Sequence, residues 1–216
     1  MNDPMEGVHR LSTVFSKQAG ASNESQLIEN ARVKLGIASF SEVLYHEPMW
    51  AHYTDKFEGI CIAYNFSRLL SELDDNVRFV RMNYNDNAPI LRWKKGTVDE
   101  NARLTISTKT SRWSYEREWR LISPSIGAAD YENNCVVRVY LGSKIDGKEK
   151  KLLIRHLEDL NIPVSQMTLD KYSMRFEPIP ASSNPAKKPS KVLSKAGAMK
   201  KAKPVYKVKR AVKRRA

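Results

Sequence analysis

Two periodicities of hydrophobic residues alternate along the first 180 residues of the chain. Apolar residues that recur every three or four positions predict helices with one buried face, and Pro48 suits the first turn of such a helix. The helices expected from this spacing and from capping residues are 23–34, 47–53, 67–73, a short one around 90–94, 97–110 and 146–160. In the last helix the predicted apolar face consists of Leu152, Leu153, Leu157 and Leu160.

Runs rich in β-branched and aromatic residues predict strands between these helices. The expected strands are 37–41, 60–66, 77–84, 135–141, 164–169 and 172–179. Asp170 and Lys171 separate the last two strands and predict a hairpin turn. Because helices and strands do not follow a regular βαβ order, the sequence predicts a single α+β domain over residues 1–180, with a mixed, mainly antiparallel sheet and flanking helices.

The stretch from Lys109 to Arg120 is the densest in charged and aromatic residues. If the chain is extended from Tyr115 onward, period-two alternation places Glu116, Glu118 and Arg120 on one face. Such a row is either a solvated strand face or the polar floor of a cleft that holds a ligand. Lys109 and Arg120 also have two interpretations: they either bind phosphate or are solvated surface cations.

The net charge of +13 belongs to the last 36 residues. Of the 37 Lys and Arg residues, 13 lie in 181–216, where there is no Asp or Glu, so that 1–180 hold 24 cations against 24 acids. Residues 181–216 are rich in Lys, Arg, Pro and Ala and lack apolar periodicity, which predicts a disordered tail that binds DNA or RNA without sequence preference. The cations assigned to this contact are Lys187, Lys188, Lys201, Lys207, Lys209, Arg210, Lys213, Arg214 and Arg215.

Several classes of site are not expected from the sequence. The two cysteines, Cys61 and Cys135, stand far apart in apolar runs and are predicted to be buried thiols, and no Cys or His spacing suits a metal, so no metal is expected. The glycine-rich phosphate-binding loops are missing. No run of 18 apolar residues and no signal pattern occurs, so a cytoplasmic protein is predicted.

Three residues on one predicted helical turn could contact a ligand. Trp50 and Tyr53 offer flat surfaces for a heteroaromatic ring. His52 is either a hydrogen-bonding or acid–base group of such a site, or a core or rim residue whose hydrogen bonds are satisfied.

Three groups of motifs together resemble a known family. Asn2–Glu6 lies in a predicted tight turn that ends at Gly7, and two further groups follow. They are Ser39–Glu42 with Met49–Tyr53 and Gly59–Ile62, and Lys109 with Trp113–Arg120. In this order they resemble the bacterial family of uncharacterised proteins called domain of unknown function 2971, over roughly residues 2–142.

The resemblance implies a fold relationship and a set of motif positions, and no activity. Its polar motif positions are expected to converge in space, and they are Asp3, Glu6, His52, Lys109, Glu116, Glu118 and Arg120. The family places a strand and a helix before the Asn-Asp-Pro turn at which this chain begins. Either the true start lies upstream, or this version is truncated relative to the family and inactive.

A second similarity, to ADP-ribosyltransferases, gives an enzyme hypothesis. Such enzymes use a Ser-x-Ser strand, aromatic residues around nicotinamide, and a Glu-x-Glu motif, and Ser39 with Ser41, Trp50 with Tyr53, and Glu116 with Glu118 follow in that order. The similarity implies NAD as substrate, Glu118 as the catalytic acid, Glu116 as the residue that activates the acceptor, and a nicotinamide pocket that includes His52. The alternative is a non-catalytic protein that binds nucleic acid or partners through its basic tail.

Overall fold

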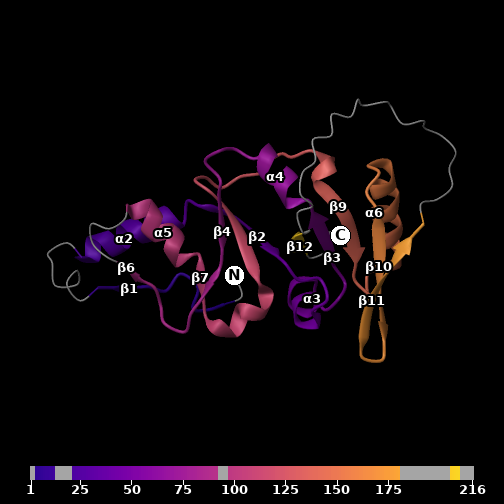
Figure 1. Ribbon diagram of the computed structural model, residues 1–216, viewed down its shortest axis with the longest axis horizontal. Helices are drawn as coiled ribbons and strands as arrows, with labels where there is room; N and C mark the ends of the chain where they lie inside the picture. Colours follow the sequence, from indigo (N-terminus) through magenta and orange to yellow (C-terminus); the bar gives the residue numbers. More distant parts are fainter. Residues whose placement is uncertain (1–2, 13–20, 92–96, 181–204, 210–216) are drawn as a thin grey trace. The chain divides into compact units, whose positions relative to one another are not determined.

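The chain divides into two compact units, each made from two segments. The structure is a computed structural model, and it describes residues 3–12, 21–91, 97–180 and 205–209, the last range and residues 21–22 by backbone alone (Figure 1). Unit 1 takes 1–43 and 73–130, and unit 2 takes 44–72 and 131–216. Each unit is described by itself, so the expectation of one domain over residues 1–180 stays a prediction.

Unit 1 contains a three-stranded antiparallel sheet with β8 in its middle. Its helices are α2 (Ala21–Arg32), α5 (Val98–Thr105) and the 3-10 helix η1 (Ser111–Glu116). Its strands are β1 (Arg10–Leu11), β2 (Gly36–Ser41), β4 (Arg78–Arg81), β5 (Asn83–Tyr84), β6 (Ile90–Leu91), β7 (Thr108–Lys109) and β8 (Glu118–Ser123). Strands β2 and β4 both pair antiparallel with β8. Two short parallel pairs, β1 with β6 and β5 with β7, complete the unit.

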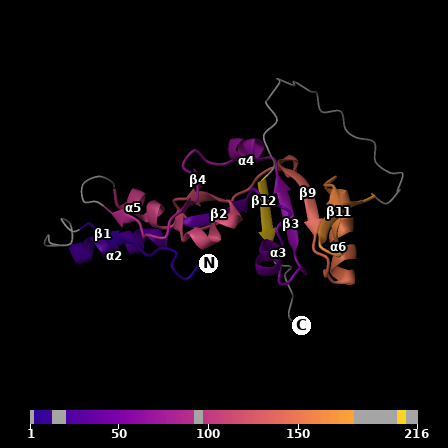
Figure 2. The same cartoon turned by 60° about the horizontal axis from the view of Figure 1, so that its bottom comes forward.

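Helices α2 and α5 lie side by side and bury a small apolar core (Figures 1 and 2). Ile28, Leu91 and Ala102 form this core. A capping box begins α5, because the Thr97 hydroxyl accepts from the Glu100 N–H and the Glu100 carboxylate accepts from the Thr97 N–H. The short helix expected around 90–94 is wrong at residues 90–91, which form β6, while 92–96 lie outside the described residues.

Unit 2 contains a mixed, mainly antiparallel sheet. Its helices are α3 (Glu47–Tyr53), α4 (Phe66–Glu72), the 3-10 helix η2 (Asn133–Cys135) and α6 (Gly147–Asp159). Its strands are β3 (Ile60–Tyr64), β9 (Val136–Leu141), β10 (Val164–Asp170), β11 (Ser173–Ile179) and β12 (Val205–Lys209). They follow the order β11-β10-β9-β3-β12, in which only the β9–β10 pair is parallel. The predicted α+β class and mainly antiparallel pairing are confirmed.

Helix α6 packs on the β9–β10 part of this sheet. Leu157 on α6 belongs to a buried cluster with Val139 and Val164, and Leu153 packs against it. The Asp146 carboxylate caps the helix by accepting from the first backbone N–H groups. Leu152, predicted on the apolar face, is instead 67% exposed. Leu153 and Leu157 are four residues apart and lie on one face of the helix, whereas Leu152 lies on another face.

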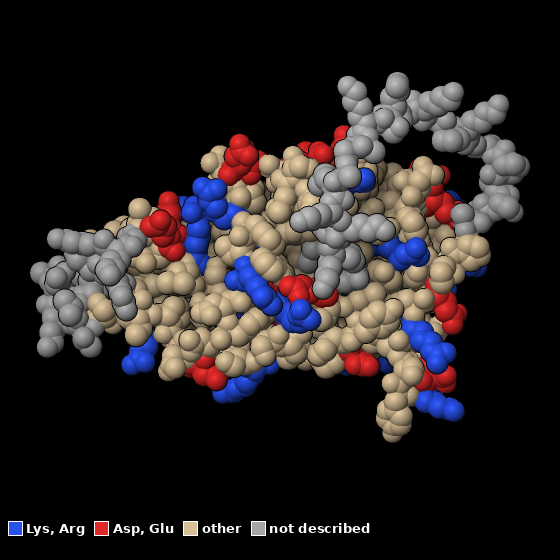
Figure 3. All heavy atoms as spheres, in the orientation of Figure 1, with Lys and Arg blue, Asp and Glu red and all other residues tan. Residues whose placement is uncertain are grey.

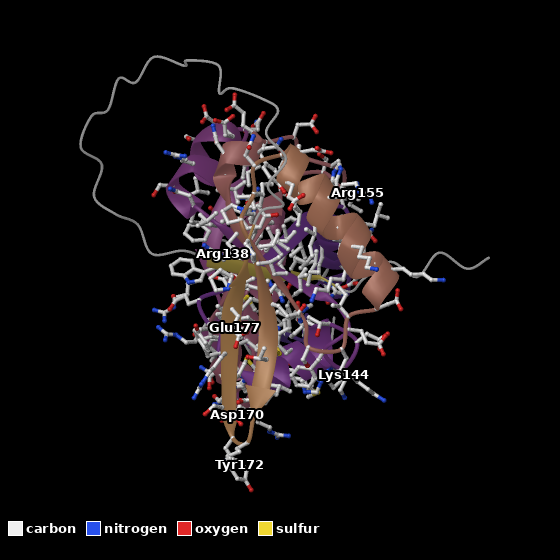
Figure 4. The ribbon with its side chains drawn as sticks, turned by 90° about the vertical axis from the view of Figure 1, so that its right-hand side faces the viewer. Arg138, Lys144, Arg155, Asp170, Tyr172 and Glu177 are labelled. Carbon is white, nitrogen blue, oxygen red and sulfur yellow. The ribbon has the colours of Figure 1, made fainter. Side chains whose placement is uncertain are left out.

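The hairpin and the central strand of unit 2 were both predictable from composition. β10 and β11 pair along their whole length, up to Asp170 opposite Ser173. The turn therefore consists of Lys171 and Tyr172, one residue later than predicted, and Tyr172 stands fully exposed at the tip (Figure 4). β3 lies between β9 and β12, as its apolar run predicts.

Both cysteines are free and buried, as predicted, and burial raises the pKa of the Cys61 thiol well above its usual range.

Strand β12 comes from the segment predicted to be a tail. Val205–Lys209 pairs antiparallel with β3, from Val205 opposite Tyr64 to Lys209 opposite Ile60 (Figure 2). The remaining residues of 181–216 lie outside the described part of the chain. Among the described residues, no helix combines the length and the hydropathy that crossing a membrane requires.

Candidate functional site

The two acids of the Glu-x-Glu motif meet at a junction between a helix and a strand. Glu116 is the last residue of η1, Arg117 has left-handed backbone angles (φ 45°, ψ 49°), and Glu118 begins β8. The predicted strand alternation is therefore wrong before Glu118. The acids share a side because Arg117 reverses the backbone between them, which is an uncommon conformation for a residue other than glycine.

Lys109 lies between the two carboxylates. Its Nζ is 2.7 Å from Glu116 Oε2 and 2.6 Å from Glu118 Oε2. Strand β7 presents this lysine after the turn that ends α5, and Lys109 pairs with Tyr84 of β5. The ammonium also lies 5.6 Å from the centre of the Trp113 ring. All three charged side chains are at most 6% exposed, so this is a buried ion network and not a solvated strand face.

Arg120 continues the network from the same strand as Glu118. Its Nε donates to Glu118 Oε1 at 2.7 Å and its Nη2 donates to Glu118 Oε2 at 3.3 Å. Its Nη1 donates to Glu6 Oε1 and to the carbonyl oxygen of Ile106, the latter at 2.5 Å. The guanidinium thus joins β8 to the N-terminal turn and to the end of α5.

The N-terminal turn brings two more acids to this place. Asp3 Oδ1 accepts from the Met5 N–H at 2.9 Å, and Asp3 Oδ2 accepts from the Thr110 N–H at 3.2 Å. Gly7 has φ +87°, which the left-handed end of the turn requires. The predicted tight turn is confirmed, and it places the Glu6 carboxylate on Arg120.

Opposite charges alternate along this buried chain. In spatial order its members are Glu116, Lys109, Glu118, Arg120 and Glu6, and Asp3 is linked to them by accepting from the backbone N–H of Thr110, the residue after Lys109. We call these six residues the ion network. It holds four carboxylates and two cations, and each member is at most 9% exposed. Six of the seven polar motif positions expected to converge lie together within unit 1, and the seventh, His52, belongs to unit 2.

Electrostatics hold the middle of the ion network in its charged form. Burial alone would raise the pKa of Glu118, but Arg120 and Lys109 outweigh it, and the pKa is lowered. Burial alone would lower the pKa of Lys109, but Glu118 and Glu116 outweigh it, and the pKa is raised. The pKa of the Tyr84 hydroxyl is raised by burial first and then by the carboxylates nearby. Sequence analysis missed this tyrosine, which accepts from the Glu118 N–H at 2.8 Å.

The two serines of the Ser-x-Ser pattern lie next to the ion network on β2. Ser41 stands directly opposite Glu118, and Ser39 stands opposite Arg120. The buried Ser41 hydroxyl donates to the Glu116 carbonyl oxygen at 2.6 Å and accepts from the Val43 N–H at 3.1 Å. Ser39 is exposed. Ser41 and Glu118, which are distant in sequence, are thus neighbours in the sheet, and Glu116 contacts Ser41 through its backbone carbonyl oxygen.

The opposite face of β8 carries an aromatic pair that the sequence did not identify as a unit. Trp119 stacks on Phe79 with ring centres 4.4 Å apart, and Arg81 lies over the Trp119 ring. The Trp119 indole N–H donates to Glu42 Oε1 at 2.6 Å, and Glu42 Oε2 pairs with Arg117 at 2.5 Å. Glu42 therefore holds the left-handed residue between the two motif acids, which gives a structural reason for its place in the Ser39–Glu42 motif.

The aromatic and histidine candidates belong to unit 2. Trp50 is 1% exposed, its indole N–H donates to the Leu44 carbonyl oxygen, and its ring lies against Phe176. This packing gives Trp50 a core role. His52 is exposed and Tyr53 is half-buried on the same helix. The roles predicted for these three residues at a nicotinamide pocket stay predictions.

Charge on the described surface is mixed. On the face shown in Figure 3, Lys and Arg side chains are interspersed with Asp and Glu side chains, in line with the equal numbers of cations and acids in residues 1–180. Of the cations assigned to nucleic-acid contact, Lys207 and Lys209 lie in β12, and the other seven lie outside the described residues. Within the described residues, no three His, Cys, Asp or Glu side chains form a group that could hold a metal ion.

The comparisons with known proteins bear on the motif region. The family model described as "Protein of unknown function (DUF2971)" matches residues 49–121. The resemblance predicted from the motifs is confirmed. The DUF2971 match includes Lys109, Glu116, Glu118 and Arg120, and it ends one residue after the arginine. It carries no activity. Neither a curated protein nor a solved structure matches the chain.

Proposed function

We propose that unit 1 carries the catalytic centre of an NAD-dependent ADP-ribosyltransferase-like or NAD-cleaving enzyme. The observation that carries the proposal is the position of Ser41 directly opposite Glu118, with Glu116 and Glu118 joined through Lys109. Two of the three short patterns that suggest this enzyme class are therefore neighbours in space.

The charge of the ion network favours a reaction in which a ligand becomes positive. When the bond between ribose C1′ and the nicotinamide nitrogen breaks, its electron pair leaves with nicotinamide and positive charge develops on the ribose. An acceptor hydroxyl or water then forms the new bond to C1′ and releases a proton. Four buried carboxylates against two cations give the network a net negative charge, and fixed negative charge in a buried site stabilises such a transition state.

Within this proposal the acids have different roles. Glu118 has both oxygens bound to Lys109 and Arg120, which fixes its position and contributes charge to the site. Glu116 has a cation on one carboxylate oxygen and is the residue assigned to acceptor activation. Ser41 anchors the backbone of Glu116 to β2 and so keeps the acids beside that strand.

The test measures release of nicotinamide from labelled NAD by the full chain. Wild type is expected to release nicotinamide, and Glu118→Gln is expected to lose turnover because it removes charge from the middle of the ion network. Asp75→Asn, which neutralises an exposed acid of unit 1, is the matched control and should keep wild-type rates. Rates are compared at a temperature where circular dichroism shows all variants folded. Wild type without release, or equal rates for wild type and Glu118→Gln, would contradict the proposal.

A second proposed function, non-catalytic nucleic-acid binding, rests on the composition of residues 181–216. Thirteen cations without an acid release condensed counterions when they contact a phosphate backbone, so affinity for any duplex should fall steeply between about 50 and 200 mM salt. Because β12 pairs with β3, deleting the whole segment would also remove a strand from the unit 2 sheet. The sharper variant replaces the cations outside 205–209 with Gln, and the control replaces Lys148, Lys150 and Lys151 of α6. Gel-shift binding that survives the tail variant would contradict this proposal.

A further inference from the structure

The Glu6 carboxylate is buried, and its two oxygens differ in their hydrogen bonds. Its Oε1 accepts from Arg120 Nη1, whereas its Oε2 has no hydrogen-bond partner among the described residues. The side chain is 1% exposed, so bulk water does not solvate the second oxygen. Buried polar atoms nearly always have a partner, and an unsatisfied charged group is destabilising.

In the described structure no hydrogen-bond donor reaches this oxygen. The cations of the ion network are engaged elsewhere, because Arg120 directs Nε and Nη2 to Glu118 and Lys109 pairs with Glu116 and Glu118.

The chemistry of the surroundings selects the kind of partner. The excess of carboxylates over cations in the ion network favours a group that donates hydrogen bonds over an anion. A metal ion is disfavoured, because the described residues form no group of three ligands that could hold one. A carboxylate oxygen that accepts from a sugar hydroxyl is a recurrent way in which proteins bind nucleotide ribose.

We propose that Glu6 Oε2 binds a ribose hydroxyl of a nucleotide, and that Glu6 is the carboxylate of the ion network that contacts the ligand directly. This inference rests on the proposed NAD-dependent function and adds a residue role to it. Glu118 is saturated by two cations, whereas Glu6 keeps one oxygen for a ligand. Arg120 links the two acids, so the ligand contact and the fixed charge belong to one network.

Ligand entry requires the N-terminal turn to move, because Glu6 is buried beneath it. The turn is attached to the rest of the site by Arg120 at Glu6 and by the Thr110 N–H at Asp3. Gly7, with its positive φ, lies directly after Glu6 and lacks a side chain that would resist rotation. A bound nucleotide would replace the missing partner of Oε2 as the turn closes again.

The experiment measures NAD binding to the full chain by isothermal titration calorimetry. Loss of a hydrogen bond to a charged group weakens binding about 10- to 100-fold, so Glu6→Gln is expected to bind NAD that much more weakly than wild type. Asp75→Asn is the control and should bind as wild type does. Wild type should also bind a 2′-deoxyribose analogue of NAD, or a 3′-deoxyribose analogue, more weakly than NAD, a comparison that needs no variant and holds even if Glu6→Gln fails to fold.

The outcomes separate this inference from the proposed function. Glu6-dependent NAD binding without nicotinamide release supports the ribose contact and overturns the enzyme. Nicotinamide release with equal NAD affinities for wild type and Glu6→Gln supports the enzyme and overturns the ribose contact. Equal affinities of wild type for NAD and all deoxyribose analogues, or no NAD binding at all, also overturn the contact. A crystal structure in which Oε2 bonds only to a buried water, with NAD bound elsewhere, does the same.

Discussion

Lys109→Met tests how much the ion network contributes to folding. Methionine has nearly the length of lysine but removes the charge, so Glu116 and Glu118 both lose the Lys109 ammonium, while Glu118 keeps its contact with Arg120. Removing one partner of a buried ion pair destabilises a protein by about 3–5 kcal/mol, because the other charge stays buried. For a chain of this size each kcal/mol lowers the melting temperature by about 2–4 °C. The expected fall is therefore about 6–20 °C.

The assay is thermal and urea unfolding followed by circular dichroism, with Lys34→Met as control. Lys34 is an exposed cation of unit 1, so its replacement should change the free energy of unfolding by about 0.5 kcal/mol or less. The double variant Lys109→Met/Glu116→Gln should be more stable than Lys109→Met alone, since position 116 then no longer carries a buried charge that has lost the Lys109 ammonium. A cost below about 1 kcal/mol for Lys109→Met is what exposed ion pairs give, and it would refute the argument that the network is buried and strongly coupled.

Three further predictions concern the ion network, the backbone at Arg117 and the basic tail. The pKa of Glu118 is lowered on folding, so its contribution to the free energy of unfolding is present above the unfolded pKa of about 4.3 and is lost as pH falls through the folded pKa. The pKa of Lys109 is raised on folding, so its contribution is present below the unfolded pKa of about 10.4 and is lost as pH rises through the folded pKa. Urea midpoints measured against pH should therefore show a plateau between about pH 5 and 10. Glu118→Gln should make the fall of the midpoint on the acid side of this plateau less steep. Arg117→Val should destabilise the protein by about 1–2 kcal/mol more than Arg117→Gly in urea unfolding, because the left-handed backbone there disfavours a β-branched residue; equal stabilities would show that the backbone is not constrained. Gln in place of the tail cations outside 205–209 should remove most of the salt-dependent shift of a duplex in a gel, and an unchanged shift would place that contact elsewhere.

The elements of the fold could largely be predicted, because their signals are local. Capping residues, the proline at the start of α3 and the two-residue turn between β10 and β11 are each set by neighbouring side chains. The prediction failed where the signal was short or where partners were distant. Strand β6 has two residues and is defined by its pairing with β1. Strand β12 is defined by its pairing with β3, while the surrounding segment 181–216 has the composition of a disordered chain.

The candidate site was predictable as a set of residues but not as a geometry. Polar motif positions without a place in the apolar periodicity indicated that Asp3, Glu6, Lys109 and Arg120 belong together, and the structure joins them in the ion network. The reason for the convergence of the two motif acids was hidden, because it depends on the left-handed conformation of Arg117. An arginine in the sequence does not predict this conformation, because arginine adopts it only when contacts such as the ion pair with Glu42 support it.

The order of charges along the network separates residues that hold the structure from residues that could meet a ligand. A carboxylate in the middle, such as Glu118, lies between two cations, so its removal leaves both of them short of a partner and stability falls first. A carboxylate at the end, such as Glu6, has one cation and an oxygen for which the described residues offer no partner. Its replacement by glutamine should therefore cost the fold less than it costs a ligand contact. The Glu-x-Glu motif was the obvious place to look for the reacting acid. Within the proposed function Glu118 supplies fixed charge and Glu116 activates the acceptor, so the residue proposed to contact the ribose is Glu6 of the N-terminal turn.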